Sequence, residues 1–481
     1  LVIYYLLLVL IGWVNIYASV QTDEPTSIFD TNCRSGMQFI WIVTALGLAA
    51  VILFLINPRI YEGFSLPIYL IVLFLLVAVI FLGIEVKGSR SWFDFGPVKF
   101  QPAEISKIST SLMLATVMSQ LGYKINRMRD FLITAAIILV PMMVIIMESE
   151  TGLSLVYVGF IFMLYREGLS GWLIFLLGMA ILTFVLTMST SVFTTILVLM
   201  AITSFCIFLY SGWFKPWFII CLPVIVLLAF VPSILEALST TTIPAEGAEG
   251  VATEVLHPFW SKIKPTYILG GLLAVLIPVA GFFSFKANNK FAQLAIVAFI
   301  AGIILVFSTD FIFHNVLQWH QRTRIEVLLG LKDDPTGIGY NVNQSKIAIG
   351  SGGFFGKGFL HGTQTAYGFV PEQSTDFIFC TIGEEWGFFG CAAVLLIYFL
   401  FILRIIKDAE KSREAFTRIY GYCVACCLFM HLFINVGMTL GIMPVIGIPL
   451  PLVSYGGSSM WGFTALIFIF IALNRNENKY Y

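Results

Sequence analysis

The chain has 481 residues, of which 59% are hydrophobic and 11% charged, and its mean hydropathy is +0.94. Soluble domains are about 45–50% apolar and about 25% charged, so this composition excludes an ordinary soluble protein. The formal net charge of +0 gives no indication of nucleic-acid binding. Most of the eight cysteines lie in apolar runs, where they are expected to be small buried side chains rather than a disulfide framework.

Long apolar runs predict an all-α, polytopic integral membrane protein. They are continuous rather than alternating, which excludes a membrane β-barrel. The first run begins at Leu1, is long enough to span, and is too long for a signal-peptide core, so we expect a cytoplasmic stub to precede it. In chain order, about fourteen candidate spans lie at 1–18, 38–56, 66–84, 103–120, 131–147, 152–165, 170–188, 191–211, 217–236, 266–285, 291–312, 375–403, 419–440 and 457–473.

The charges between these runs predict the orientation of the chain. With the N-terminus in the cytoplasm, the basic clusters at 124–129 and 404–418 fall inside, and the acidic residues at 23–30 and 246–254 fall outside. Cytoplasmic loops are the ones enriched in Lys and Arg. We therefore expect both termini in the cytoplasm and a polar interval at 313–375 outside it.

Charged residues occur at two places near the outer ends of the early spans. Pro102 suits the start of a helix. Glu104 and Lys107 are three residues apart, so they lie on the same face of that helix. Buried charges in a span usually face a cavity or a partner, which favours a functional role over a structural one. Glu148 and Glu150 stand where the fifth predicted span meets the sixth.

The chain is expected to divide into four parts: N-terminal helices at 1–166, an expanded helical region at 167–312, the extracytoplasmic loop at 313–375, and C-terminal helices at 376–481. The expanded region contains a flexible outer linker around 239–250 and no catalytic constellation.

The interval 313–375 contains the strongest chemical candidate. Asp334 begins an Asp-Pro-x-Gly turn. The residues alone allow two interpretations with about equal weight: a capped turn, or a carboxylate that serves as a general base or cation ligand. The stretch before it predicts an interfacial helix whose Arg322 and Arg324 face lipid phosphates, or ordinary solvated charge.

Two further irregular segments are expected near the site. The glycines between 350 and 362 fit either an anion-binding nest or a tightly folded loop. The segment from Pro449 to Ser459 breaks the helix between the last two spans, so its hydroxyls and free amides are candidates for ligand contact. Asp376 and Glu385 lie at and within the twelfth span. His431, in the thirteenth, is interpreted as a satisfied packing residue.

Several motifs in order resemble the SEDS family of RodA and FtsW. They are Phe100-Gln101-Pro102-Ala103-Glu104 with Lys107, Asp334-Pro335-x-Gly337-x-Gly339-Tyr340 with Gln344-Ser345, Thr375-Asp376-Phe377 with Gly383-Glu384-Glu385, and Pro449 to Ser459. The runs at 347–364 and 448–453 are similar to the elongation-type RodA branch.

This resemblance implies a peptidoglycan glycosyltransferase that polymerises lipid II with inversion and releases undecaprenyl diphosphate. It implies a class B penicillin-binding protein and elongation-complex proteins as partners, a bacterial cytoplasmic (inner) membrane location, and a ten-helix core with about four extra spans between 167 and 312. The family's essential loop aspartate corresponds to Asp334, which is expected to act as a base or to hold Mg²⁺ or Mn²⁺. A flippase or a scaffold of the wall-synthesis complex remains the alternative.

The residues expected at this site form two groups. Those expected to bind substrate are Glu104, Lys107, Gln344, Ser345, Lys357, His361, Ser454, Tyr455 and Ser458, and further cavity candidates are Trp92, Glu150, Asp376 and Glu385. At the junction where the family commonly has Gln-Pro-Asp-Leu-Gly, this chain has Glu148-Ser149-Glu150-Thr151-Gly152. The carboxylate of the family's Asp is therefore kept as Glu150, whose side chain is one methylene longer.

Overall fold

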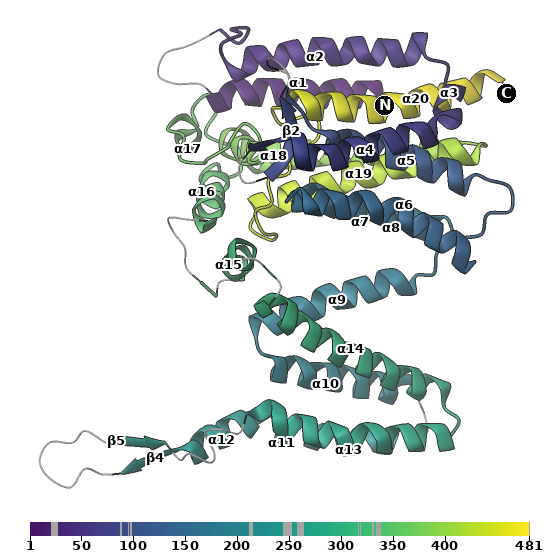
Figure 1. Cartoon of the computed structure of the whole chain (residues 1–481). Helices are drawn as coiled ribbons and strands as arrows, with labels where there is room; N and C mark the ends of the chain where they lie inside the picture. Colours follow the sequence, from purple (N-terminus) through teal and green to yellow (C-terminus); the bar gives the residue numbers. More distant parts are fainter. Residues whose placement is uncertain are drawn as a thin grey trace, which may run out of the picture. The chain divides into compact units, whose positions relative to one another are not determined.

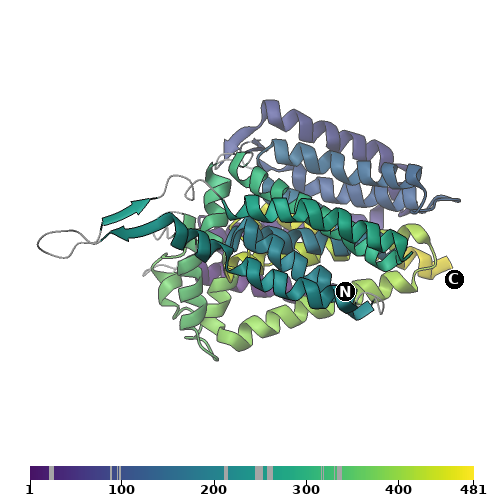
Figure 2. The ribbon, with the colours of Figure 1, turned by 90° about the horizontal axis from the view of Figure 1, so that it is seen from below.

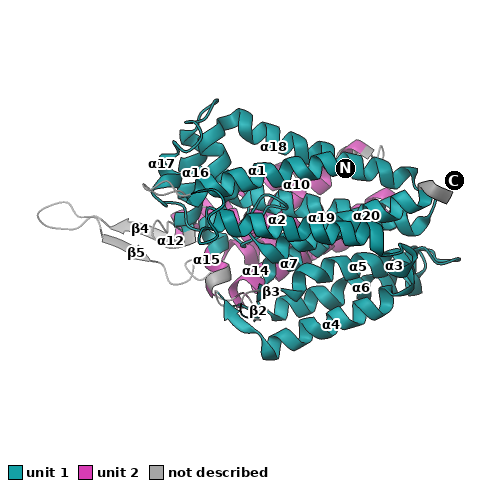
Figure 3. Cartoon of the chain, turned by 90° about the horizontal axis from the view of Figure 1, so that it is seen from above, with its two compact units in different colours: residues 1–174, 324–481 teal, residues 175–323 magenta. Residues whose placement is uncertain are grey.

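The computed structural model describes residues 1–481 except 21–26, 87–88, 95, 97–98, 211–214, 244–252, 257–263, 316, 318, 330, 333–337 and 481. The chain forms two compact units (Figure 3). Unit 1 contains Leu1–Ile174 and Arg324–Tyr481, and unit 2 contains Phe175–Thr323.

Each predicted apolar run lies in one or two helices of the structure. They are α1 (Val2–Val20), α2 (Arg34–Ala50), α4 (Ser65–Leu82), α5 (Pro102–Met118), α6 (Met128–Met147), α7 (Thr151–Val158), α8 (Phe160–Arg166), α9 (Trp172–Ser189), α10 (Val192–Tyr210), α11 (Lys215–Ala229), α12 (Val231–Ser239), α13 (Pro265–Lys286), α14 (Lys290–Asn315), α18 (Ile378–Lys411), α19 (Ala415–Thr439) and α20 (Gly457–Tyr480). Among the described residues, ten helices are long and apolar enough to cross a membrane, and three further apolar helices are shorter.

The chain also contains short elements that the apolar runs did not predict. A π-helical segment (Val51–Leu55) extends α2, and α3 (Arg59–Gly63) follows it. β1 (Ile84–Val86), β2 (Ser89–Asp94) and β3 (Lys99–Phe100) form an antiparallel sheet in that order, and β4 (Thr240–Ile243) pairs with β5 (Thr253–Leu256). These strands are two to six residues long, so helical periodicity and spanning length carry no signal for them.

Helix α19 forms the centre of unit 1. It packs against α5, α7, α8, α16, α18 and α20, and it is the most deeply buried of the candidate spans. Its neighbours supply a single core of aliphatic and aromatic side chains. The polar side chains His431, Asn435 and Thr439 of α19 are fully buried.

The interval 313–375, predicted as an extracytoplasmic loop whose first part was expected to be an interfacial helix or solvated charge, contains three helices: α15 (Trp319–Leu328), α16 (Ile338–Ser351) and α17 (Thr363–Ala366). Within unit 1, α16 and α17 lie at one end, and both termini lie at the other (Figures 1 and 2). The end that contains α16 and α17 also contains the start of α2, the strands β1, β2 and β3, and the segments 148–152 and 440–457. We call it the loop end.

A break in α18 explains the glycines of 352–358. Gly387 adopts φ +64° and ψ −160°, so α18 is two helices joined at a kink. The amides that follow the kink donate to the loop: Phe388 N to Gly353 O at 2.9 Å, and Phe389 N to Phe354 O at 3.2 Å. A Cβ at Gly387 would lie 2.3 Å from Gly356 N. Of the two interpretations of these glycines, the structure shows a tightly folded loop.

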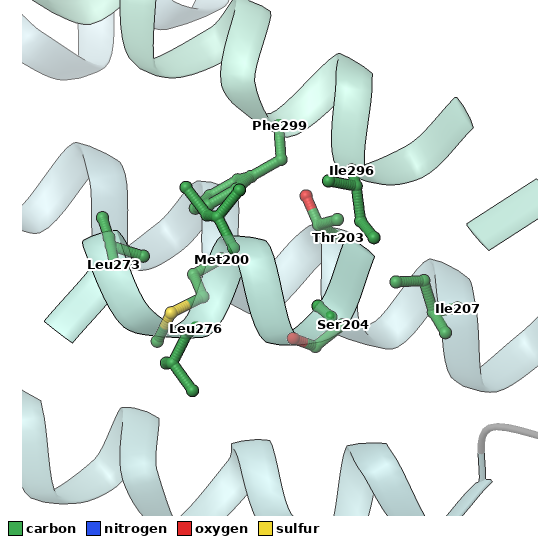
Figure 4. A pocket seen from close by; sticks show the side chains of 10 residues that line it. Met200, Thr203, Ser204, Ile207, Leu273, Leu276, Ile296 and Phe299 are labelled. Atoms are coloured by element: carbon green, nitrogen blue, oxygen red, sulfur yellow. The ribbon is translucent and has the colours of Figure 1, made fainter. Parts of the chain in front are cut away.

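Unit 2 has its own apolar core, built mainly from α10, α11, α13 and α14. A pocket opens between α10, α13 and α14 (Figure 4). Met200, Leu273, Ile296 and Phe299 line it, and Thr203 and Ser204 supply hydroxyl groups. None of the predicted site residues belongs to this unit.

Candidate functional site at the loop end

A buried ion pair on α5 connects three helices of unit 1. Lys107 Nζ lies 2.8 Å from Glu104 Oε2, and each side chain is about 2–3% exposed. The same ammonium lies 2.9 Å from His431 Nε2 on α19 and 4.4 Å from the centre of the Phe463 ring on α20. The structure thus confirms that Glu104 and Lys107 share a helix face, and it shows what that face contacts.

The geometry determines the state of His431. An ammonium group can only donate, so Nε2 accepts from Lys107, and Nδ1 carries the proton that it directs toward Pro449 O at 3.4 Å. His431 is satisfied, as expected, but it is also the third member of the charged cluster. The sequence did not show this, because the contact requires α19 to pack against α5.

A second polar cluster joins β2 to the junction between α6 and α7. Glu150 Oε1 accepts hydrogen bonds from Ser89 Oγ at 2.8 Å, Ser91 Oγ at 2.7 Å and Gln101 Nε2 at 3.4 Å. Trp92 is half-buried in β2, where it pairs with Ile84. The longer carboxylate is therefore held by the hairpin that precedes α5.

Glu148 stands beside this cluster in a different state. Its side chain is 2% exposed, and among the described residues neither carboxylate oxygen has a hydrogen-bond partner. Burial, and then the charge of Glu150, raise the pKa of Glu148 to about 8. Ser149 between them adopts φ +66°, which is unusual for a residue other than glycine.

The segment before α20 is hydrogen-bonded to residues 374 and 375, which lie just before α18. Ser454 Oγ donates to Thr375 O and accepts from Leu450 N, and Tyr455 N donates to Ser374 O at 2.9 Å. Asn435 Nδ2 of α19 donates one hydrogen bond to Asp376 O at 2.8 Å and another to Ile448 O at 2.7 Å. These bonds give partners to several groups of the irregular backbone before α20.

We call the surface formed by Ser454, Tyr455 and Asp376 the wall of the loop end, and other residues contact it. Arg34, at the start of α2, donates to Ser374 Oγ at 2.6 Å and lies over the Tyr455 ring at 5.8 Å. Ser458 is half-buried in the first turn of α20. The Asp376 carboxylate faces Gly447. The structure thus brings Ser454, Tyr455 and Asp376 together.

Helix α16, which follows Asp334 in the sequence, is hydrogen-bonded to the end of α19. Ser345 is fully buried and donates to Thr439 O at 2.9 Å, and Gln344 is half-buried beside it. Asp334, the predicted base and metal ligand, lies outside the described residues, in the segment between α15 and α16. Its described neighbours are Lys332 before it and Ile338 after it.

Lys357 and Glu385 lie in a separate cluster around the break in α18. Lys357 Nζ lies 2.8 Å from Glu384 Oε1, a carboxylate that also accepts from Thr365 and from the amide of Gln364. Glu385 accepts from Leu360 N at 3.2 Å. His361 is exposed, and its Nδ1 donates to Phe359 O at 2.8 Å.

The described predicted residues therefore occupy five places within unit 1. These are the buried Glu104–Lys107 pair, the β2 cluster with Trp92 and Glu150, helix α16 with Gln344 and Ser345, the segments around Ser454, Tyr455 and Asp376, and the loop around Lys357. Gly152, two residues after Glu150, packs against Ile446 and Ile448, which places the β2 cluster next to the wall. The sequence missed His431, Asn435, Arg34 and the serines of β2. Only their polarity beside apolar runs could have signalled them.

Comparisons with known proteins agree on one family. The FtsW/RodA/SpoVE model, described as a cell cycle protein, matches residues 1–205 and 266–479. The peptidoglycan glycosyltransferase MrdB of Escherichia coli is 30% identical over 424 residues, covering 86% of this chain and 79% of the relative. The peptidoglycan glycosyltransferase RodA of Treponema pallidum is 30% identical over 410 residues, covering 84% and 81%.

Two solved structures share the fold. One chain, from a peptidoglycan synthase complex described as coordinating polymerization and crosslinking, has a TM-score of 0.58 at 22% identity and covers 99% of this chain and 97% of its own. The rod shape determining protein RodA of Thermus thermophilus has a TM-score of 0.50 at 20% identity, covering 99% and 96%. The family model omits only 206–265 from the interior, a shorter stretch than the predicted expansion at 167–312.

Proposed function

Because this chain belongs to the FtsW/RodA/SpoVE family, we propose that it is a peptidoglycan glycosyltransferase that polymerises lipid II during cell elongation. The names of its relatives support this activity. The observation that carries the proposal is the convergence at the loop end, where β2 meets Glu150, the start of α18 meets Ser454, and α16 meets the end of α19.

The proposed reaction transfers one glycan chain to one acceptor hydroxyl. Asp334 takes the proton of the acceptor 4-hydroxyl, whose oxygen forms a bond to the anomeric carbon of the donor from the opposite face. The bond from that carbon to the diphosphate breaks, and its electron pair leaves with undecaprenyl diphosphate. General-base catalysis of this kind contributes about 10²–10⁴-fold in rate.

The diphosphate leaving group is anionic and needs electrostatic help. We propose that Mg²⁺ or Mn²⁺ assists by neutralising that charge, and holding this cation is the alternative role of Asp334 to that of base. Within the described part of the chain, no group of three or more His, Cys, Asp or Glu side chains could hold a metal ion.

Removing divalent cations should lower the polymerisation rate of the purified protein. The expected result is a loss on adding a chelator and a recovery on adding back Mg²⁺ or Mn²⁺ in excess. Full activity in chelator, with metal content checked by elemental analysis, would remove the cation from the proposal.

The other predicted residues have distinct proposed roles. Gln344, Tyr455 and Ser458 are proposed to contact substrate at the loop end, and the buried Ser454 is proposed to hold the segment that carries them through its two hydrogen bonds. Glu104 and Lys107 are too buried for direct contact in this conformation. Their proposed part is to hold α5, α19 and α20 together beneath the site.

We further propose a class B penicillin-binding protein as the partner, which supplies crosslinking. The likeness to a chain from a synthase complex supports an association of this kind. The proposed location is the bacterial cytoplasmic membrane, crossed about fourteen times, with the loop end outside. Basic residues at the other end of unit 1, among them Arg166, Arg404 and Arg418, favour this orientation.

The activity can be tested with purified protein in proteoliposomes and lipid II supplied from outside. We expect glycan polymer to form without any other enzyme. A flippase would move lipid II across the bilayer without polymerising it, and a scaffold would do neither. Either of those results, from correctly folded protein, would contradict the proposed enzyme.

A further inference from the structure

A pocket at the loop end combines positive charge with an apolar wall. It lies between the C-terminal half of α15, helix α16 and the segment after α19. Arg324 and Lys346 enter it from α15 and α16, and Val327, Leu328, Met443 and Pro444 form apolar parts of its wall. The Lys346 chain packs against Gly441, where an added Cβ would lie 2.3 Å from Lys346 Cε. Gly441 has φ +71°, so both its backbone and this contact require glycine.

The two cations of this pocket have no counter-charge among the residues that the structure describes. No acidic residue lines the pocket. Neither side chain makes an ion pair or hydrogen bond with another described residue. Burial lowers the pKa of the Arg324 guanidinium, which shows that this charge is partly withdrawn from water. Arg324 is half-buried and Lys346 is exposed, so the cost of withdrawing charge from water falls on the Arg324 guanidinium, and an anion bound in the pocket would offset it.

Arg322, two residues before Arg324 on α15, has different surroundings. The Arg322 guanidinium lies 5.1 Å from the centre of the Phe313 ring and does not line the pocket. Of the two arginines expected to face lipid phosphates, only Arg324 therefore enters the cavity. This difference supplies a matched control.

We propose that this pocket binds the diphosphate of a polyprenyl-linked sugar, with Arg324 and Lys346 on its oxygens and the apolar wall against the first isoprenoid units. The inference rests on the proposed function and assigns it a substrate subsite. The segment that carries Asp334 joins α15 to α16, so the pocket lies at the two ends of that segment. Charge-assisted hydrogen bonds to phosphate oxygens are the strong ones, and they would stabilise the leaving group as the sugar–oxygen bond breaks.

The first test measures binding without catalysis. Full-length protein in nanodiscs of zwitterionic lipid is titrated with undecaprenyl diphosphate, comparing wild type with Arg324→Gln, Lys346→Gln, the double variant and Arg322→Gln. Each single variant in the pocket should bind about tenfold more weakly, which is about 1.4 kcal/mol, because it removes one charge-assisted hydrogen bond. Arg322→Gln should stay within about twofold of wild type, and Lys346→Arg should retain binding.

The second test measures catalysis with lipid II. We expect the KM for lipid II to rise in the pocket variants, and inhibition by added undecaprenyl diphosphate to weaken in parallel. If wild type binds undecaprenyl diphosphate through these residues yet makes no polymer, the subsite holds and the proposed enzyme fails. Equal binding by wild type and a double variant with wild-type melting behaviour would overturn the subsite.

A third arm identifies the source of the phosphate. Adding anionic phosphatidylglycerol to the nanodiscs should compete only weakly, because it carries one phosphate and no isoprenoid chain. Competition as strong as that of undecaprenyl diphosphate, lost in the same variants, would make the pocket a general lipid-headgroup site and contradict the assignment.

Discussion

Glu148 makes a pH-dependent contribution to stability at the scale of a single residue. Its pKa is raised to about 8 from 4.5 because its carboxyl is buried without a partner. A raised carboxyl pKa favours the protonated folded state, so the contribution is fully present below about pH 4.5 and is lost as pH rises through 8. Glu148→Gln should therefore melt a few degrees higher than wild type at pH 9, with the difference shrinking towards pH 5.

The control for this substitution is Glu150→Gln, two residues away. Glu150 accepts two serine hydrogen bonds and one from Gln101, so an amide there should destabilise the protein at both pH values. Melting curves in detergent provide the measurement. A Glu148→Gln curve that follows wild type from pH 5 to 9 would show that Glu148 does not titrate in this range.

The Lys107 cluster leads to a second prediction at the residue scale. Lys107→Met leaves the Glu104 carboxylate buried without its ion pair, and losing one partner of such a pair costs about 3–5 kcal/mol. The double variant Glu104→Gln/Lys107→Met should regain most of this loss, because no charge remains uncompensated. Thermal unfolding of the three proteins gives the comparison. A double variant less stable than Lys107→Met would contradict it.

The sequence predicted contacts between residues close in the chain better than contacts between residues far apart in it. The shared face of Glu104 and Lys107 follows from a spacing of three, which is local information. His431 and Asn435 acquire their roles only when α19 meets α5 and the segment before α20, and such contacts are distant in sequence. Buried polar groups must be satisfied by something, but one sequence does not show which helix supplies the partner.

At the scale of elements, the kink in α18 is the feature on which the loop 352–358 depends. Gly387→Ala would place a Cβ 2.3 Å from Gly356 N and force a side chain into φ +64°. We expect the loop to detach, with faster proteolytic cleavage within 353–361. Gly350→Ala is the matched control, since nothing lies within 4 Å of a Cβ there. Equal cleavage of the two variants would contradict this account of the kink.

Apolar runs predicted the long helices well, because spanning length and hydropathy are properties of the segment itself. They did not predict α16 or the hairpin of β1 and β2, whereas α15 lies where an interfacial helix was one of the two expectations. Helix α16 packs against α18 and α19, and the hairpin is held to Glu150 by its serines, so both depend on contacts that are distant in sequence. The glycines of 352–358 were ambiguous for the same reason, since their close contacts are with α18.

At the scale of the whole molecule, the proposed orientation can be tested by chemical labelling. In a Cys33→Ser background, Tyr367→Cys at the loop end and Leu121→Cys at the opposite end place one thiol at each end. Both native side chains are highly exposed, at 71% and 105%. An impermeant maleimide should label Tyr367→Cys in intact cells and Leu121→Cys only after permeabilisation. The reverse pattern would overturn the orientation.

The central claim is that the loop end polymerises lipid II with Asp334 as its base or cation ligand. The most direct measurement is the initial rate of undecaprenyl diphosphate release and polymer formation by purified wild type and Asp334→Asn with equal melting temperatures. We predict that the variant still binds lipid II but turns over at least about a hundredfold more slowly. A folded Asp334→Asn protein that polymerises at the wild-type rate would contradict the claim.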